Sequence, residues 1–430
     1  MRYTYFTFLV MPFALIFNIN LSANDTIDEV TVTSSFTNQS LVELKSPLHI
    51  INGTDIENDA SQSLGESIDN FLGVSSSDFG AAVGQPVIRG LSGARVKILN
   101  NNYVVRDVSS LGADHLNDVD LNNIEQIEII RGPSSLLFSK GSSGGVINIV
   151  DNTIAKKDFS ESIFTLGGEF SSVNDGLGGN FSYQGNISGI NLSASFNKFD
   201  FENYDVPNGA VMEEEHHEEE HEGEDEGPIK VLENSDYERE TKRFGLSRAG
   251  SWGYFGFSFS DNDSLYGIPF HEEGEGHHEG EHEGEEDHDE EGEHEDEHEH
   301  HEDERIFSTT DNKVYTFEGR YNLDNSLVSN VEYFFRNSDY SHIEQHAEEE
   351  GEEHSEEEHE EEEPTLFSNE SNEFGLRFSS DKESLNQKLV FNFIDEEITV
   401  IGEEAFVPPT ESKEITMGYY INTDFSLFDL

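Results

Sequence analysis

The chain alternates apolar and polar side chains over most of its length after residue 160. Phe255, Phe257 and Phe259, separated by single small or polar residues, are typical of this pattern. A period of two with one apolar face predicts β-strands. Ten such segments are expected, at residues 160–172, 177–188, 190–203, 237–250, 252–262, 307–322, 326–340, 367–380, 386–400 and 413–430.

The connections between these segments alternate in length. Short turns, such as those at 249–251 and 323–325, alternate with long loops over residues 204–236, 264–306 and 341–366. A soluble β-sandwich also has period-two strands, but short turns at one end and long loops at the other are typical of outer-membrane barrels. If the first strand starts at the periplasmic side, all three long loops lie on the external rim.

The first residues read as an export signal. Arg2 precedes an apolar run over residues 3–19, and small residues follow up to Ala23. This order predicts a secretory signal peptide over residues 1–23. No other stretch approaches the roughly 18 apolar residues of a spanning helix, so we expect strands to make any membrane crossing.

Three acidic tracts, at residues 213–226, 271–304 and 344–363, lack lysine and arginine. They hold 43 of the 91 Asp and Glu residues and 15 of the 18 histidines. Such tracts are usually solvated and disordered, but an acidic loop has no physical need for so much histidine. Imidazole nitrogen with carboxylate oxygen suits zinc best among common ions, and copper, nickel and cobalt less selectively. The candidate ligands here are His216, His217, His221, His271, His277, His278, His282, His288, His294, His298, His300 and His301.

Charge and composition exclude several classes of function. The formal net charge is −67, so we expect no nucleic-acid partner. The chain has no cysteine, so any metal is held by nitrogen and oxygen ligands. We find no nucleophile–base arrangement, phosphate loop or cofactor fingerprint, and therefore expect a protein that is not an enzyme.

The region before the strands is mixed in composition and punctuated by glycine. It resembles the plug-domain signature of TonB-dependent outer-membrane receptors in the segments PVIRGLSG at 86–93, IEQIEIIRGP at 124–133 and GSSGGVINI at 141–149. The resemblance implies a mainly β protein, with an α+β plug over residues 41–155 inside a transmembrane antiparallel β-barrel. Residues 156–430 are then the N-terminal part of that barrel. The family's barrel has 22 strands, so ten predict a partial barrel from a longer protein.

The same resemblance implies roles for two further groups of residues. Within residues 24–40, an energy-coupling box that pairs with a TonB-type inner-membrane protein is expected at Asp28, Glu29, Val30, Thr31, Val32 and Thr33. Structural roles in the plug are expected for Arg89, Gly90, Arg131, Gly132, Pro133, Gly144 and Gly145. Ions in an enclosed domain need partners, so Arg89, Arg131, Glu125 and Glu128 are expected to hold the plug fold and dock it to the wall. Asparagine tolerates the left-handed region, so a turn is expected at residues 100–102.

Within that family the chain is most similar to the zinc-uptake receptors. The similarity is carried by SSLGADH at 109–115, YGIP at 266–269 and DYSHIE at 339–344. In such receptors an Asp-His pair on an apical plug loop takes part in the zinc site, and the matching residues here are Asp114 and His115. His342 and Glu344, two residues apart at the external end of a strand, share one face and are expected to complete the site.

The expected function is import of a divalent metal, zinc first, through the bacterial outer membrane. Zinc is then the transported ligand, and the partners are a TonB-type coupling protein and outer-membrane lipid. Two alternatives stay open: a receptor of the same fold for a siderophore or metallophore chelate, and a surface protein that buffers metal without transporting it. The ligand types do not separate zinc from nickel or copper.

Overall fold

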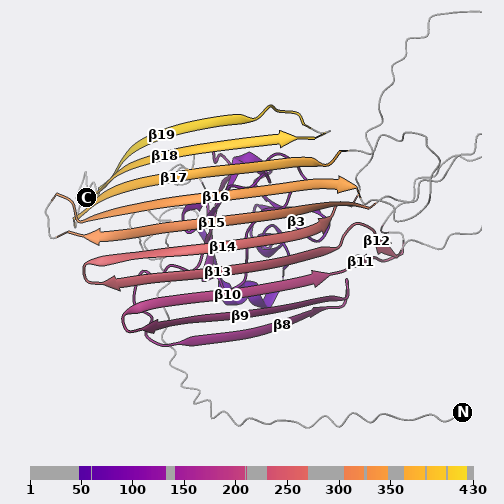
Figure 1. Ribbon diagram of the computed structural model, residues 1–430, viewed down its shortest axis with the longest axis horizontal. Helices are drawn as coiled ribbons and strands as arrows, with labels where there is room; N and C mark the ends of the chain where they lie inside the picture. Colours follow the sequence, from indigo (N-terminus) through magenta and orange to yellow (C-terminus); the bar gives the residue numbers. More distant parts are fainter. Residues whose placement is uncertain are drawn as a thin grey trace, which may run out of the picture.

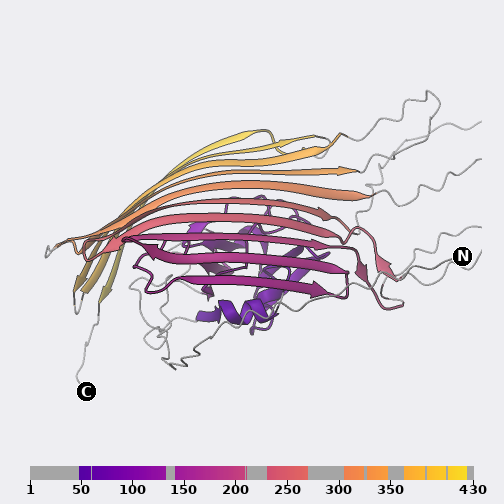
Figure 2. The same ribbon diagram turned by 60° about the horizontal axis from the view of Figure 1, so that its bottom comes forward.

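The computed structural model describes residues 48–59, 61–131, 141–208, 210, 230–269, 305–323, 327–346, 363–382, 385–402 and 405–423. These residues form a ten-stranded antiparallel sheet and, on its concave side, a smaller α+β domain (Figures 1 and 2). Among the described residues, no helix is long and apolar enough to cross a membrane.

The large sheet follows the chain order throughout. Its strands are β8 (Ile163–Ser171), β9 (Gly176–Ile187), β10 (Ile190–Phe201), β13 (Tyr237–Gly250), β14 (Gly253–Gly267), β15 (Ile306–Asn322), β16 (Asn330–His346), β17 (Thr365–Lys382), β18 (Leu385–Ile401) and β19 (Thr410–Thr423). A small hairpin, β11 (Tyr204–Asp205) with β12 (Val231–Leu232), lies between β10 and β13. All ten strands predicted from the alternation are confirmed.

Two strands run further than the sequence pattern predicted. β14 continues to Gly267 and β16 to His346, so the connections expected to start at residues 264 and 341 start later. Both extensions carry polar residues on the inner face, such as Ser264 and His342, because that face meets the plug and not an apolar core. The apolar alternation that marks a strand in the sequence therefore stops before the strand does.

The outer face of the sheet is apolar. A continuous row of register-paired, exposed side chains crosses seven adjacent strands: Leu246, Phe257, Phe317, Phe335, Phe374, Phe393 and Ile415. The next inward-facing positions are mostly serine, threonine, asparagine or charged residues. Apolar outside and polar inside is the pattern of a sheet that faces lipid.

The smaller domain is built on a five-stranded sheet in the order β1-β6-β7-β4-β5. Its elements are β1 (Leu48–Asn52), α1 (Gly53–Asp59), η1 (Glu66–Ile68), β2 (Val74–Phe79), β3 (Val83–Ile88), η2 (Gly93–Arg95), β4 (Val96–Asn100), β5 (Tyr103–Val104), β6 (Gln126–Ile130) and β7 (Gly145–Val150). Only the β4–β7 pair is parallel among the described strands. Its core is isoleucine-rich, with Ile127, Ile129, Ile147 and Ile149 fully buried. The predicted plug is confirmed as an α+β domain under the arch of the large sheet (Figure 2).

The residues expected to shape the plug lie mostly in its turns. Arg89 and Gly90 have φ values of 52° and 78° at the turn after β3. A Cβ on Gly145 would stand 2.8 Å from the Ile130 carbonyl oxygen, so this position accepts only glycine. The backbone amide of Gly144 donates to the Arg95 carbonyl at 3.0 Å. Gly132 and Pro133 lie outside the described residues.

The asparagine turn is also confirmed. Asn101 and Asn102 adopt φ values of 51° and 71°, in the left-handed region that asparagine tolerates. The Asn148 side chain fixes this turn, because its Oδ1 accepts from the Asn102 amide at 2.8 Å.

The charged side chains that dock the plug to the large sheet, the barrel wall, are not those that the sequence predicted. Arg131 donates to the Leu72 carbonyl and Glu125 bonds to Asn152, both within the smaller domain, and Arg89 is exposed. Plug and wall are instead joined by the ion pairs Asp118–Arg239 at 3.0 Å, Asp120–Arg243 at 2.9 Å and Arg106–Glu373 at 2.7 Å. The sequence offered no signal for these pairs, because their members are far apart in the chain.

Candidate metal centre

Three side chains from two parts of the molecule converge at one end of the large sheet. His115 lies on a plug loop, and His342 and Glu344 lie on β16. One ligand atom from each lies within 4.8 Å of the others. Oε1 of Glu344 is 2.8 Å from Nε2 of His115 and 2.8 Å from Nε2 of His342. The structure therefore brings together three of the four residues that sequence reasoning singled out for this site.

Strand β16 supplies two of the three ligands, His342 and Glu344. In a β-strand every second side chain points to the same face, so His342 and Glu344 both face the plug. Tyr340 lies on that face too, and its hydroxyl is 3.5 Å from Nδ1 of His342. Both ligands therefore come from one strand, two residues apart.

The plug loop aims His115 through its own backbone. Nδ1 of His115 lies 2.9 Å from the Val108 carbonyl oxygen. A carbonyl only accepts, so Nδ1 carries the hydrogen and Nε2 is directed to Glu344. A backbone carbonyl on the second ring nitrogen is the usual way in which a metal-ligating histidine is oriented.

Two aromatic residues of the wall enclose the loop. The Tyr266 hydroxyl on β14 donates to the Asp114 carbonyl at 3.3 Å and accepts from the Leu116 amide at 3.4 Å. Phe367 on β17 meets the rings of His115 and His342 edge-on, with centroids 4.8 Å and 5.5 Å away. Tyr266 was within a segment singled out in the sequence. Phe367 carried no signal.

The site is almost closed to solvent. His115 is 3% exposed and His342 is fully buried. Burial opposes protonation of His115, but the hydrogen bond and negative charge of Glu344 outweigh it and raise the pKa of His115. The acceptors at both ring nitrogens favour the protonated form of His115. A cation that binds here replaces the proton on Nε2.

Asp114 stands next to the three-residue group and is not part of it. A Cβ added to Gly112 would lie 2.6 Å from Oδ1 of Asp114 and 2.8 Å from Nε2 of His115. The carboxylate and the imidazole therefore flank the space left by the missing side chain of Gly112. Asp114 is half-buried, so it is placed to meet an ion before His115 does.

The remaining predicted ligands lie outside the described residues. These are all the tract histidines from His216 to His301, and the coupling segment Asp28 to Thr33 lies outside them as well. The strand ends that flank the tracts are described, and register pairs such as Tyr237 with Phe201 and His346 with Ile306 place them at one end of the sheet. That end also holds the His115 site. The predicted common rim is thus confirmed for the strands.

A second group of carboxylates, Asp261, Asp263 and Asp311, lies on the outer face of β14 and β15. Lys313 approaches both Asp261 and Asp311, at 3.8 Å and 2.5 Å. Lys313 therefore pairs with two of these three carboxylates.

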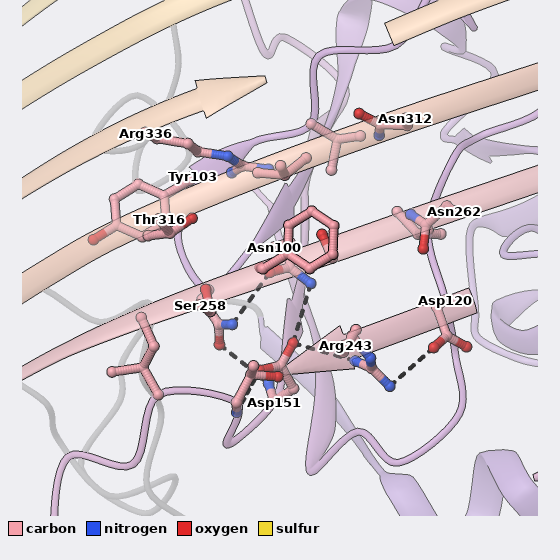
Figure 3. A pocket seen from close by; sticks show the side chains of 18 of the residues that line it. Asn100, Tyr103, Asp120, Asp151, Arg243, Ser258, Asn262, Asn312, Thr316 and Arg336 are labelled. Carbon is pink, nitrogen blue, oxygen red and sulfur yellow. Dashed lines mark hydrogen bonds and ion pairs between the residues drawn. The ribbon is translucent and has the colours of Figure 1, made fainter. Parts of the chain in front are cut away.

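Below the site, plug and wall enclose a polar cavity of about 80 Å³. Figure 3 shows Arg243 between Asp120 and Asp151, and Arg336 beside the Tyr103 ring. Asp118 of the plug loop also lines the cavity, as do Asn262 and Asn312, which lie one inward-facing row from His342. The cavity therefore begins close to the site and continues between plug and wall.

Comparisons with known proteins agree with this architecture. Residues 40–146 match the family model described as the TonB-dependent receptor plug domain. The Vitamin B12 transporter BtuB of Vibrio vulnificus (strain CMCP6) is 27% identical over 161 residues, which cover 37% of this chain and 25% of that protein. The probable TonB-dependent receptor BfrD of Bordetella pertussis is 35% identical over 86 residues, covering 19% of this chain and 10% of that protein.

Solved structures share the fold at low identity. The copper transporter OprC superposes with a TM-score of 0.59 at 12% identity, covering 86% of this chain and 51% of that one. The ferric enterobactin receptor PfeA of Pseudomonas aeruginosa gives 0.56 at 14%, covering 88% and 55%. The chain thus spans about half the length of these receptors. Residues 40–146 are thus similar to the plug domain of TonB-dependent receptors, and the described residues share the fold of these solved receptors.

Proposed function

We propose that the protein imports a divalent transition-metal ion, zinc first, across the outer membrane. The observation that carries the proposal is the convergence of His115, His342 and Glu344 on one point between plug and wall. Two imidazole nitrogens and a carboxylate are a common set of protein ligands for zinc, with a fourth position left for water or Asp114.

The distances fit an ion that enters with little rearrangement. Ligand atoms around tetrahedral zinc are roughly 3.3 Å apart, given bonds of about 2.0–2.1 Å. Glu344 now lies 2.8 Å from each imidazole nitrogen, as hydrogen bonds require. An outward shift of about 0.5 Å at each nitrogen turns the hydrogen-bonded state into a coordinating one.

The choice of ion follows from ligand softness. The chain has no cysteine, and the described residues around the centre offer nitrogen and oxygen ligands and no sulfur, the soft ligand that Cu(I) prefers. OprC is a copper transporter, and nitrogen and oxygen ligands also bind Cu(II) and nickel. Zinc remains the first expectation because imidazole and carboxylate together suit zinc best among the common ions.

Burial distinguishes a bare ion from a chelate. PfeA is a receptor for ferric enterobactin, and that chelate is far larger than a metal ion. His115 and His342 are 3% and 0% exposed, and Phe367 packs against both rings. A chelate reaches such ligands only if the loop opens, whereas an ion needs only the space beside Gly112.

The site joins the plug, which is proposed to move during transport, to the large sheet, which is proposed to stay in place. His115 belongs to the plug, and the other two ligands belong to a barrel strand. A pull on the plug separates His115 from His342 and Glu344, and loss of one ligand in three weakens the hold on the ion. Force applied through the coupling segment at residues 28–33 would thus release the ion into the barrel. Metal affinity is tied in this way to the position of the plug.

The acidic tracts at residues 213–226, 271–304 and 344–363 are proposed to concentrate cations at this mouth. Their 43 carboxylates attract cations over roughly 8–10 Å in physiological salt. Each loop residue that becomes ordered costs about 1–2 kcal/mol, so the tracts bind loosely and exchange ions quickly. The tighter site then takes the ion from them.

Deletion of residues 28–33 tests transport against buffering. We expect the full-length protein without this segment to bind zinc at the outer membrane as tightly as the wild type and to import none into cells that lack other zinc importers. A matched control replaces the same segment with a coupling segment from another receptor. Retention of full uptake by the deletion variant would show that the protein is not energised through this segment.

A further inference from the structure

We propose a second cation-binding position at Asp118, one step below the His115 site on the way to the cavity. The inference rests on the proposed import of a divalent ion and adds the next place that ion occupies. The ligands are oxygen atoms, from the Asp118 carboxylate and from Asn262, Ser264 and Thr310 of the wall.

The wall positions follow from the strand register. Thr310 on β15 pairs with His342, and Ser264 on β14 pairs with Thr310. The three side chains therefore form one row across the inner face, with neighbouring Cβ atoms about 4.5–5.5 Å apart. Asn262 and Asn312 pair in the next row, roughly 7 Å further from the mouth.

Three oxygen atoms in these two rows are buried without a partner. They are Oγ of Ser264, Oγ1 of Thr310 and Oδ1 of Asn262, none of which has a hydrogen-bond partner among the described residues. The residues are 6%, 5% and 7% exposed. Buried polar atoms are nearly always paired, so three unpaired neighbours beside a metal site call for a ligand that binds there transiently.

Asp118 completes the set from the plug side. Its side chain has no exposed surface. Oδ2 accepts from the amide nitrogens of Asn262 and Asn312, and Oδ1 is 3.0 Å from Nη2 of Arg239. The guanidinium of Arg239 thus holds the place that a metal cation takes when it arrives. Arg239 also shares the row of Ser264, so a small sideways shift frees the carboxylate.

The position leads into the cavity between plug and wall. Asp118, Asn262 and Asn312 line this cavity, and Figure 3 shows the two asparagines. An oxygen-only set binds zinc more weakly than a set with two imidazoles. The ion therefore passes from a tight site to a looser one, which suits release into the cavity and not storage.

A purely structural role explains only part of this arrangement. The Asp118–Arg239 pair docks the plug, and that docking requires no free oxygen atoms beside it. The unpaired hydroxyls of Ser264 and Thr310 lower stability unless something else uses them. The two explanations make different predictions for the variants below.

The first experiment removes the guanidinium of Arg239 from the Asp118 carboxylate. We use full-length protein without residues 213–226, 271–304 and 348–363, so that the weak tract sites are gone, and titrate it with zinc by calorimetry. The wild-type centre should bind one ion and Arg239→Gln should bind two. Arg239→Gln with Asp118→Asn should return to one. A folded Arg239→Gln protein that binds a single ion overturns the proposal.

The second experiment leaves the ion pair intact. Ser264→Ala with Thr310→Val should slow zinc uptake at saturating zinc by about 3- to 10-fold, the effect of losing uncharged oxygen contacts, with tight binding at the His115 site unchanged. Ser371→Ala is the control, because its Oγ is also buried and unpartnered but lies on β17, two rows below. Wild-type uptake in the double variant contradicts the second position. Absence of zinc binding in the wild type instead contradicts the proposed import.

Discussion

Nε2 of His115 lies 2.8 Å from Oε1 of Glu344, and these two atoms join the plug to the barrel wall. The same Oε1 is 2.8 Å from Nε2 of His342, so one carboxylate oxygen bridges two imidazoles. Without an ion this is a hydrogen-bonded bridge, and with an ion it is a ligand set. Under the proposed function, the contact that docks the plug at the mouth would also bind the metal ion.

Removal of the bridge should abolish tight zinc binding. His115→Ala leaves one imidazole and one carboxylate, and we expect zinc affinity to fall by more than about 100-fold, because loss even of an outer-shell partner of a metal ligand costs 10–100-fold. Asp114→Ala should cost less, since Asp114 is outside the three-residue group. Competitive titration against a zinc chelator gives both values. Glu344→Gln should match His115→Ala, and Glu370→Gln, on the outer face of β17, is the control.

The response to pH should separate the centre from the tracts. The raised pKa of His115 means that its proton competes with zinc at a higher pH than an ordinary histidine of about 6.5. As the pH falls, the zinc affinity of the centre should begin to decline at a higher pH than that of the tracts, whose affinity should decline between about 7.5 and 5.5. Calorimetry on the wild type and on a tract deletion measures both. Loss of the two classes of site at one pH contradicts this assignment.

The same pKa shift affects docking of the plug in the opposite direction. A histidine with a raised pKa in the folded protein contributes stability at low pH, and that contribution is lost as the pH rises through the raised value. In the ion-free protein, the plug loop at His115 should therefore be held more firmly at pH 6 than at pH 8.5. Hydrogen exchange of the loop amides near Leu116 measures this. His115→Ala should remove the dependence.

Deletion of residues 271–304 tests the proposed concentration of cations by the tracts. Uptake should fall chiefly when zinc is scarce and stay near the wild-type maximum at saturating zinc. The reason is that a loosely binding tract raises the frequency with which zinc ions meet the centre but is not itself the obligatory site. The effect should shrink at high ionic strength, where the field is screened. Replacement of the tract by a neutral linker of equal length controls for loop length. Loss of uptake at every zinc concentration contradicts the proposal that this tract only concentrates cations.

Gly112 should be intolerant of any side chain. In Gly112→Ala the new Cβ would lie 2.6 Å from Oδ1 of Asp114 and 2.8 Å from the His115 ring, so one of the two has to move. We expect zinc affinity to fall by about tenfold or more, an effect of the size seen when a ligand loses its orientation. Gly168→Ala is the control, because its Cβ would meet nothing closer than 3.8 Å. Equal affinity in both variants would mean that the space beside Gly112 is not used.

Tyr266→Phe tests the support of the loop from the wall. The hydroxyl bonds to the backbone of Asp114 and Leu116, on both sides of His115, and its loss should weaken zinc binding by about 3- to 10-fold through one lost hydrogen bond on each side. Tyr254→Phe removes a buried hydroxyl from the same strand at Glu318, away from the centre, and is the control. Rescue of wild-type affinity by stabilising the loop elsewhere would support a positioning role.

The sequence by itself determined the elements. Alternation with a period of two predicts all ten strands, because one face of each strand is apolar and meets lipid. It also predicts which connections share a rim, since strand direction reverses at every hairpin. The pairing of His342 with Glu344 follows from the same period. These features depend on local geometry, which a short stretch of sequence contains.

Only the tertiary structure decided which residues meet across the plug and the wall. Tyr266, Phe367 and Arg239 act on the plug loop, and no spacing in the chain relates them to His115, because their contacts depend on how a separate domain sits inside the sheet. The ends of β14 and β16 were missed for the same reason: their inner faces are polar since they face the plug. The contacts between the plug and the large sheet depend on how the two surfaces dock. The docking energy depends on both surfaces together, so neither sequence segment alone predicts these contacts.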